Sequence, residues 1–133
     1  MAKIERVEDL EIWKLAREIC KDIHHFIETT SLGKNYALRD QMDKCSGSVM
    51  DNIAEGFERN GNREFIQFLS IAKASCGELR SQLYRALDRR HIDQATFDIQ
   101  FEKVVLESKQ IGSFMNYLYK SDFKGSKYNR RTL

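Results

Sequence analysis

Hydrophobic residues recur along most of this chain in alternating steps of three and four positions. This spacing places them on one face of an α-helix, as in a helix packed against neighbours. The pattern predicts four helices, over about residues 7–29, 35–57, 62–90 and 94–119. The expected core positions are Ile12, Ala16, Ile19, Ile23 and Phe26 in the first helix; Leu38, Met42, Cys45, Val49 and Asn52 or Ile53 in the second; Phe65, Leu69, Ala72, Cys76, Leu79, Leu83 and Ala86 in the third; and Phe97, Phe101, Val104, Ile111, Met115 and Leu118 in the fourth.

Short polar segments separate these helices. Thr29-Thr30-Ser31 followed by Gly33 is expected to end the first helix and cap the second. Gly56 and Asn60-Gly61-Asn62 predict a tight turn, with Asn60 or Asn62 capping the third helix, and Asp93 is expected to cap the fourth. Because the loops are short, consecutive helices must run antiparallel. The predicted fold is all-α, an antiparallel up-down-up-down four-helix bundle within residues 1–119.

Composition and charge agree with a single bundle and separate its end from its body. The 133 residues are 41% hydrophobic and 32% charged and include no proline, so long helices can run uninterrupted. The formal net charge is +2, but residues 120–133 hold five basic residues against one acid, which leaves −2 for residues 1–119. We expect residues 120–133 to form a basic, flexible tail that aids solubility or contacts phosphate.

The chain offers little for a metal, a cofactor or a membrane. Three cysteines without metal-type spacing indicate reduced thiols in a cytoplasmic protein. Cys20, His24 and Glu28 follow one another at helical spacing, but Cys20 belongs to the hydrophobic stripe and no fourth ligand is evident. No hydrophobic run reaches the ~18 residues of a membrane helix. The sequence therefore predicts no metal site, no cofactor and no membrane partner.

The stretch SVMDNIAEGFERN, residues 48–60, carries polar side chains on or beside the second seam. If the second and third helices turn near residues 59–60, positions whose numbers sum to about 119 lie side by side. A polar row between these helices then fixes their register, with Asn52 donating and accepting between helices and Gly56 where the helix ends or another helix comes close. The residues of this expected structural motif and its facing positions are Gln41, Ser48, Asn52, Glu55, Gly56, Arg59, Ser75 and Glu78, with Gln41 facing Glu78, Lys44 facing Ser75, Ser48 facing Ile71, and Asn52 facing Gln67 and Phe68.

One pattern suggests catalysis. Arg85 is followed after five residues by His91, which resembles the loose signature of HEPN-type ribonucleases. There the arginine would stabilise a phosphate in the transition state and the histidine would transfer a proton. The alternative is that basic residues simply favour the C-terminal end of a helix dipole.

Hydrophobic residues also lie off the four seams. A small bundle with such residues on a second face usually has a partner for them. We therefore expect a homo-oligomer, with Trp13 and Tyr84 as candidate interface residues. The residues in question are Trp13, Leu15, Phe57, Ile66, Ile71, Tyr84 and Tyr117.

These residues together resemble a known family. The chain is similar to the bacterial four-helix bundle proteins encoded in intervening sequences of 23S ribosomal RNA genes, which include the accessory variability proteins of diversity-generating retroelements. Departures are Thr30-Ser31 in place of a frequent Phe-Pro, Lys44 in place of arginine and Gly61 in place of a capping serine. The resemblance covers about residues 7–119 and is carried by Leu10, Trp13, Leu38, Gln41, Ser48, Val49, Asn52-Ile53-Ala54-Glu55-Gly56, Arg59, Glu64-Phe65, Phe68-Leu69, Ile71-Ala72, Ser75 and Glu78-Leu79.

The resemblance implies a homopentamer without known catalytic activity. It also implies that retroelement relatives bind nucleic acid and a reverse transcriptase through basic surface on the assembled ring. Here basic residues of the middle helices, together with the tail, predict sequence-independent binding of RNA or DNA, although interspersed acids weaken the field. The candidate contacts are Arg39, Lys44, Arg63, Lys73, Arg80, Lys124, Lys127, Arg130 and Arg131.

Overall fold

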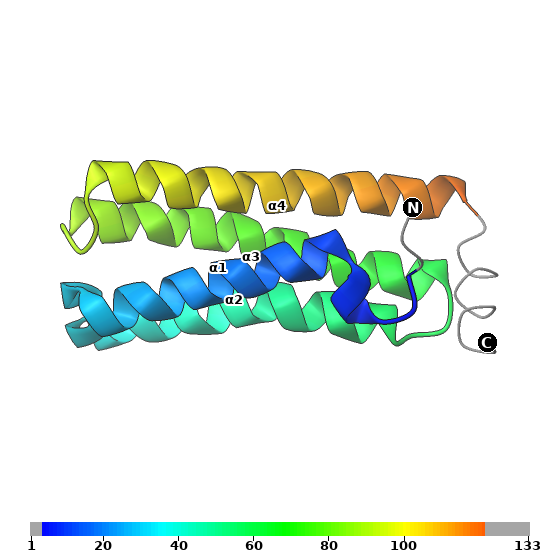
Figure 1. Cartoon of the computed structure of the whole chain (residues 1–133), viewed down its shortest axis with the longest axis horizontal. Helices are drawn as coiled ribbons and strands as arrows, with labels where there is room; N and C mark the ends of the chain where they lie inside the picture. The colour runs from blue at the N-terminus through cyan, green and yellow to red at the C-terminus, as the bar shows by residue number, and fades with distance from the viewer. Residues whose placement is uncertain (1–3, 122–133) are drawn as a thin grey trace.

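The computed structural model describes residues 4–121, which form four long helices and two short 3-10 turns (Figure 1). Consecutive helices run in opposite directions along the long axis, and each contacts two neighbours, so that the contacts α1–α2, α2–α3, α3–α4 and α4–α1 close the bundle. The predicted all-α four-helix fold is confirmed. Most of the expected tail, residues 122–133, lies outside the described residues. The elements are η1 Val7–Asp9, α1 Glu11–Thr29, η2 Ser31–Lys34, α2 Tyr36–Phe57, α3 Asn62–Asp88 and α4 Gln94–Lys120.

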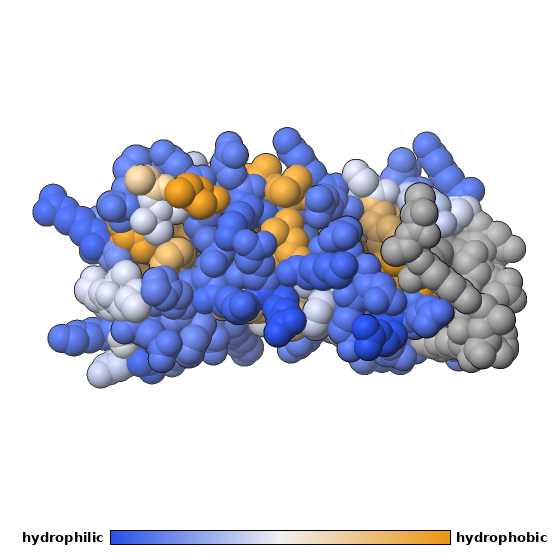
Figure 2. All heavy atoms as spheres, viewed as in Figure 1, coloured by the Kyte–Doolittle hydropathy of each residue, from blue (hydrophilic) through white to orange (hydrophobic). Residues whose placement is uncertain are grey.

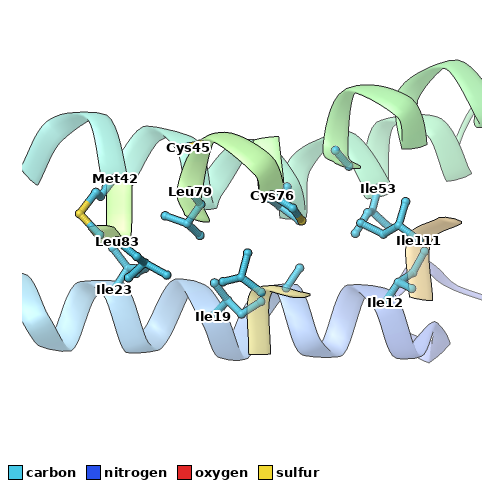
Figure 3. Close-up of a cluster of buried hydrophobic side chains, with 14 of the residues drawn as sticks. Ile12, Ile19, Ile23, Met42, Cys45, Ile53, Cys76, Leu79, Leu83 and Ile111 are labelled. Atoms are coloured by element: carbon cyan, nitrogen blue, oxygen red, sulfur yellow. The ribbon is translucent and has the colours of Figure 1, made fainter. Parts of the chain in front are cut away.

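The core lies where the four hydrophobic seams meet (Figure 3). Every core position expected on α1 and α3 is buried. On α2, Ile53 is fully buried whereas Asn52 is only half-buried, so Ile53 is the core residue of that pair. On α4, Phe101 and Met115 are half-buried rather than buried. Two of the six core positions expected on α4 are therefore only partly buried.

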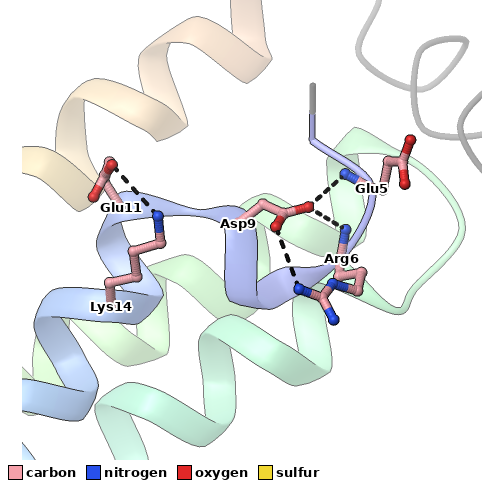
Figure 4. Close-up of polar contacts among 5 residues, drawn as sticks. All are labelled: Glu5, Arg6, Asp9, Glu11 and Lys14. Atoms are coloured by element: carbon pink, nitrogen blue, oxygen red, sulfur yellow. Dashed lines mark hydrogen bonds and ion pairs between the residues drawn. The ribbon is translucent and has the colours of Figure 1, made fainter. Parts of the chain in front are cut away.

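The first helix begins later than expected. Residues 7–9 form the 3-10 turn η1, and Leu10 is extended, with φ −78° and ψ 131°, before α1 starts at Glu11. The Asp9 carboxylate explains the break, because it accepts hydrogen bonds from the backbone N–H groups of Glu5 and Arg6 at 2.9 and 3.0 Å (Figure 4). These bonds lower the pKa of Asp9 and stabilise the turn. Leu10 is then buried in the core.

The joint between α1 and α2 uses two caps. The Thr30 hydroxyl accepts from the backbone N–H of Leu32 at 3.1 Å and so caps η2, not α2. Asn35 caps α2, because its Oδ1 accepts from the Leu38 N–H at 3.3 Å. The expectation that residues 29–31 cap the second helix was therefore wrong, since η2 intervenes.

The other two joints differ from each other. Neither Asn60 nor Asn62 caps α3. Gly61, in the left-handed region with φ 105°, is the residue before the helix. The Asn62 side chain instead donates to the carbonyl oxygens of Leu118 and Ser121 at 2.8 and 3.2 Å, which ties the start of α3 to the end of α4. The prediction for α4 is confirmed, because Asp93 Oδ1 accepts from the Thr96 N–H at 2.8 Å.

Across residues 4–121, none of the helices combines the length and the hydrophobicity needed to cross a membrane.

Candidate functional site

The polar row between α2 and α3 exists, but its register differs from the expected one. Ser48 Oγ lies 2.9 Å from Ser75 Oγ, and Cys45 Sγ donates to the Ser75 carbonyl oxygen at 3.1 Å. Ser48 was expected to face Ile71, whose side chain is instead 49% exposed. The partner of Ser48 is thus one helical turn further along α3 than expected, whereas the Cys45–Ser75 contact lies within one residue of the expected Lys44–Ser75 pair. The midpoint of the loop therefore predicted the partners only to within about one turn.

Gly56 lets α3 pack closely against α2. It is buried, and a Cβ atom there would lie 2.8 Å from Phe68 Cβ and 2.9 Å from Phe65 Cδ1. Both phenylalanines therefore pack directly against the backbone of α2, and this close approach sets the level of α3. Helix α2 continues to Phe57, whose ring meets Phe65 edge-on at 6.1 Å. Of the two roles expected for Gly56, the structure has the close approach and not the helix end.

Asn52 supports Ser48 rather than bridging the helices. Its Nδ2 donates to the carbonyl oxygen and to Oγ of Ser48, at 2.8 and 3.0 Å. Both of these bonds remain within α2, so the expectation that the Asn52 amide donates between helices was wrong. The bridge is the Ser48–Ser75 pair. Asn52 occupies one lone pair of the Ser48 hydroxyl oxygen, and the Ser48 and Ser75 hydroxyls share a hydrogen bond that either of them can donate.

The remaining motif residues lie on the outer rim of this row. Glu55 and Arg59 pair at 2.9 Å, one helical turn apart, and the guanidinium lies 5.0 Å from the centre of the Phe68 ring. Gln41 does not pair with Glu78, which is exposed; its Oε1 accepts from Arg85 Nη1 at 2.9 Å. The motif therefore consists of the Ser48–Ser75 bridge, one exposed ion pair at the C-terminal end of α2 and the Gln41–Arg85 hydrogen bond. The serine bridge and the Gln41–Arg85 bond join α2 to α3.

His91 joins two loops at one end of the bundle. Its Nε2 lies 3.0 Å from Asn35 Nδ2 and its Nδ1 lies 2.7 Å from Ser31 Oγ. Because Asn35 Oδ1 already accepts from Leu38, the Asn35 amide nitrogen must face the imidazole and donate to Nε2. The neutral ring then carries its proton on Nδ1 and donates it to Ser31. Both ring nitrogens are thus used in connecting η2 to the loop between α3 and α4.

The expected ribonuclease pair is therefore engaged in two separate contacts. Arg85 is bound to Gln41 of α2, and His91 is bound to η2 and to the cap of α2. Arg90, between them, has φ 62°, and the His91 N–H bonds back to the Ala86 carbonyl at 2.9 Å, which ends α3 in a left-handed C-cap. The segment closes a helix and fastens a loop.

The spacing considered for a metal does not produce a ligand cluster. His24 Nε2 and Glu28 Oε1 lie 3.2 Å apart on the exposed side of α1. Cys20 is half-buried on the same helix, and burial raises the pKa of its thiol. Residues 4–121 contain no group of three or more histidine, cysteine, aspartate or glutamate side chains arranged to hold a metal ion.

Sequence reasoning missed a buried carboxyl in the core. Glu107 of α4 is 0% exposed, and neither of its oxygens has a hydrogen-bond partner among residues 4–121. Burial raises the pKa of this carboxyl to about 8. Burial, together with the neighbouring Glu107 carboxyl, raises the pKa of the Cys76 thiol of α3 to about 12. The sequence did contain one sign of this buried carboxyl. Between Val104 and Ile111, the positions that face the core are 107 and 108, and they hold a glutamate and a serine.

The two residues expected at an oligomer interface differ in environment. Trp13 is half-buried against the core, with the Arg17 guanidinium 6.0 Å from its ring. Tyr84 is half-exposed on α3, and its ring lies 4.9 Å from Phe97 and 5.5 Å from Phe101 of α4. Hydrophobic side chains of this kind reach the surface among charged ones along α4 (Figure 2).

The basic residues expected to contact nucleic acid do not form one cluster. Lys44, Arg63 and Lys73 are exposed, and Arg80 is half-buried. Arg39 lies 4.6 Å over the Tyr36 ring and donates to the Gly33 carbonyl oxygen. The expected tail contacts Lys124, Lys127, Arg130 and Arg131 lie outside the described residues.

Comparison with known proteins identifies the family. None of the curated proteins compared matches the chain. The family model described as 23S rRNA-intervening sequence protein matches residues 8–113, which include all of α1, α2 and α3 and most of α4. A match over more than half of the chain, to a family whose expected four-helix fold the structure has, settles membership. The chain belongs to the 23S rRNA-intervening sequence protein family.

Proposed function

We propose that this chain works as a cytoplasmic, non-catalytic homo-oligomer, a ring of five subunits, that binds RNA or DNA without sequence preference. The observation that carries the non-catalytic part is the state of His91, whose two ring nitrogens are both used in holding loops together. A general acid or base needs a nitrogen that can reach a substrate. Three free cysteines, two of them buried, support a reducing compartment.

The oligomer is supported by the large hydrophobic side chains exposed on the subunit. Seven such residues in the described part of the chain are about half or more exposed, among them Tyr36, Ile71 and Tyr84. The number five comes from the family resemblance. Light scattering at micromolar concentration measures it directly: we expect a mass of five subunits, and a mass near that of the 15.6 kDa chain would contradict the ring.

Binding of nucleic acid is supported by exposed basic side chains, which every subunit of the proposed ring would contribute. Lys44, Arg63 and Lys73 make no ion pair in the described part of the chain and are thus available to phosphate. At the other end of α3, the hydrogen bonds of His91 to Ser31 and Asn35, here called the His91 latch, hold the loop that follows Arg89 and Arg90 against η2 and the start of α2. Binding of this kind needs no base contacts, which suits either RNA or DNA. The same surface could serve an accessory role to a reverse transcriptase.

The experiment is a mobility-shift assay at low salt with RNA and DNA of matched length. We expect both to be retarded, with an affinity that falls as salt rises, and a triple variant with glutamine at Lys44, Arg63 and Lys73 should have a shallower salt dependence. Unchanged mobility of both nucleic acids at low salt would exclude the binding.

The competing proposal, a HEPN-like ribonuclease, is tested separately. RNA cleavage by the wild type that His91→Ala abolishes would favour the enzyme, provided that circular dichroism shows the variant to be folded. We expect no cleavage by either protein.

A further inference from the structure

A hydrophobic strip is exposed on the outer face of α4. Ile99 is 65% and Leu106 47% exposed, and the two residues are seven positions apart, so they share one side of the helix. Half-buried Phe101 and Val105 lie along the same helix, next to these two exposed residues. Figure 2 shows hydrophobic side chains surfacing along α4 between hydrophilic ones. A strip of this kind usually has a protein partner.

The exposed charges along this face change sign. Asp98 and Glu102 lie in its N-terminal half, and Lys109 lies in its C-terminal half. Lys103 is already committed to α1, because its Nζ lies 2.9 Å from Glu18 and 2.8 Å from Asp22.

Of the three exposed charges, one has a partner within the subunit. Asp98 accepts from the neighbouring Gln94 side chain at 2.8 Å. Glu102 and Lys109 make no ion pair within residues 4–121. The two acids thus lie in the N-terminal half of the face, on either side of Ile99, and the base follows Leu106 in the C-terminal half.

We propose that the outer face of α4 pairs with the same face of a second copy of this chain, antiparallel about a two-fold axis near residues 103–104. In that arrangement Asp98 of each copy lies level with Lys109 of the other, and Ile99 of each lies within one turn of Leu106 of the other. A parallel pairing would place like charges together at both ends. Charge and hydrophobicity thus favour the same antiparallel register.

This contact goes beyond the proposed ring. A two-fold contact is isologous, whereas closing a ring of five needs two different surfaces on each subunit. The α4 contact therefore joins subunits of two separate rings, or two free chains if no ring forms. Its test does not depend on nucleic-acid binding.

Charge exchange tests the contact. Sedimentation velocity from 1 to about 100 µM compares the wild type with Asp98→Lys, Lys109→Asp and the double variant, with Lys44→Asp on α2 as the control. We expect each single change to weaken the α4 association at least about tenfold and the double variant to restore it to within about threefold. Single variants that associate like the control, or a double variant no better than the singles, would overturn the pairing.

Cross-linking tests the symmetry. A two-fold axis near residues 103–104 brings Glu102 of one copy close to Glu102 of the other, so Glu102→Cys should be joined to itself by a short bis-maleimide, whereas Tyr119→Cys, exposed at the far end of α4, should not. A yield for Glu102→Cys no higher than that for Tyr119→Cys would refute the two-fold contact. It would do so whatever mass light scattering gives, so failure of this contact and failure of the ring are distinguishable.

Discussion

Glu107 makes the stability of the bundle depend on pH in a direction opposite to that of most carboxylates. The folded state holds this carboxyl with a pKa of about 8, against an ordinary value of 4.5. Between these two values the folded state binds more protons than the unfolded state, so stability falls as pH rises. The contribution is complete below pH 4.5 and is lost progressively up to about pH 8.

The size of the effect follows from the pKa difference. Each unit of pH between the two pKa values costs about 1.4 kcal/mol, so raising the pH from 4.5 to 7 should remove about 3 kcal/mol of unfolding free energy. Glu107→Gln keeps the shape of the side chain and stays neutral at every pH. This variant should match the wild type to within about 1 kcal/mol at pH 4.5 and exceed it by about 3 kcal/mol at pH 7.

The assay is urea unfolding at pH 4.5, 6 and 7, monitored by circular dichroism. Glu78→Gln is the control, because Glu78 is an exposed carboxylate on α3, away from the proposed α4 contact. If Glu107→Gln kept the same dependence on pH as the wild type and the control, the buried carboxyl would have no part in it and the reasoning would fail.

Three further changes test the joints of the bundle. Gly56→Ala should cost at least about 2 kcal/mol in denaturant unfolding, because its Cβ would overlap Phe65 and Phe68, whereas Gly47→Ala, with open space around the new atom, should stabilise by up to about 1 kcal/mol; equal effects would contradict the close approach. His91→Ala should lower the unfolding free energy by about 1–2 kcal/mol through two lost loop contacts, and an unchanged melting temperature would contradict the latch. Asn52→Ala should lower the unfolding free energy by only about 1 kcal/mol, because Asn52 is half-buried and bonds within its own helix. A decrease above about 3 kcal/mol would instead support the expectation from the sequence that Asn52 bridges the two helices.

The sequence predicted the fold well because the hydrophobic repeat and the short loops are both local. The repeat from Phe65 to Ala86 is buried at every step, and Asp93 caps α4 as its position before the helix indicates. The joint at Thr30 was less predictable, since the choice between capping a 3-10 turn and capping an α-helix depends on how Leu32 is buried. That burial is a property of the packed bundle.

The register of the polar row could not be predicted from the loop between α2 and α3. Loop length fixes where helices turn, but packing at Gly56 decides how far α3 slides along α2, and that packing involves residues on both helices. The predicted partner of Ser48 was therefore Ile71, one turn away from Ser75, which is the partner in the structure. Asn52 likewise lies beside the row instead of across it.

The polar groups buried on α4 bear on how much this helix stabilises the isolated subunit. A seam containing Gln100, Glu107 and Ser108 gains less from burial than a hydrophobic one, and the unpartnered Glu107 carboxyl costs more as pH rises. Yet the same helix exposes Ile99 and Leu106 to water. A helix that buries polar groups and exposes hydrophobic ones contributes less to the isolated subunit than its length suggests. Contact between copies through its outer face would bury that hydrophobic strip, so the stability of α4 and the assembly of the protein should be coupled.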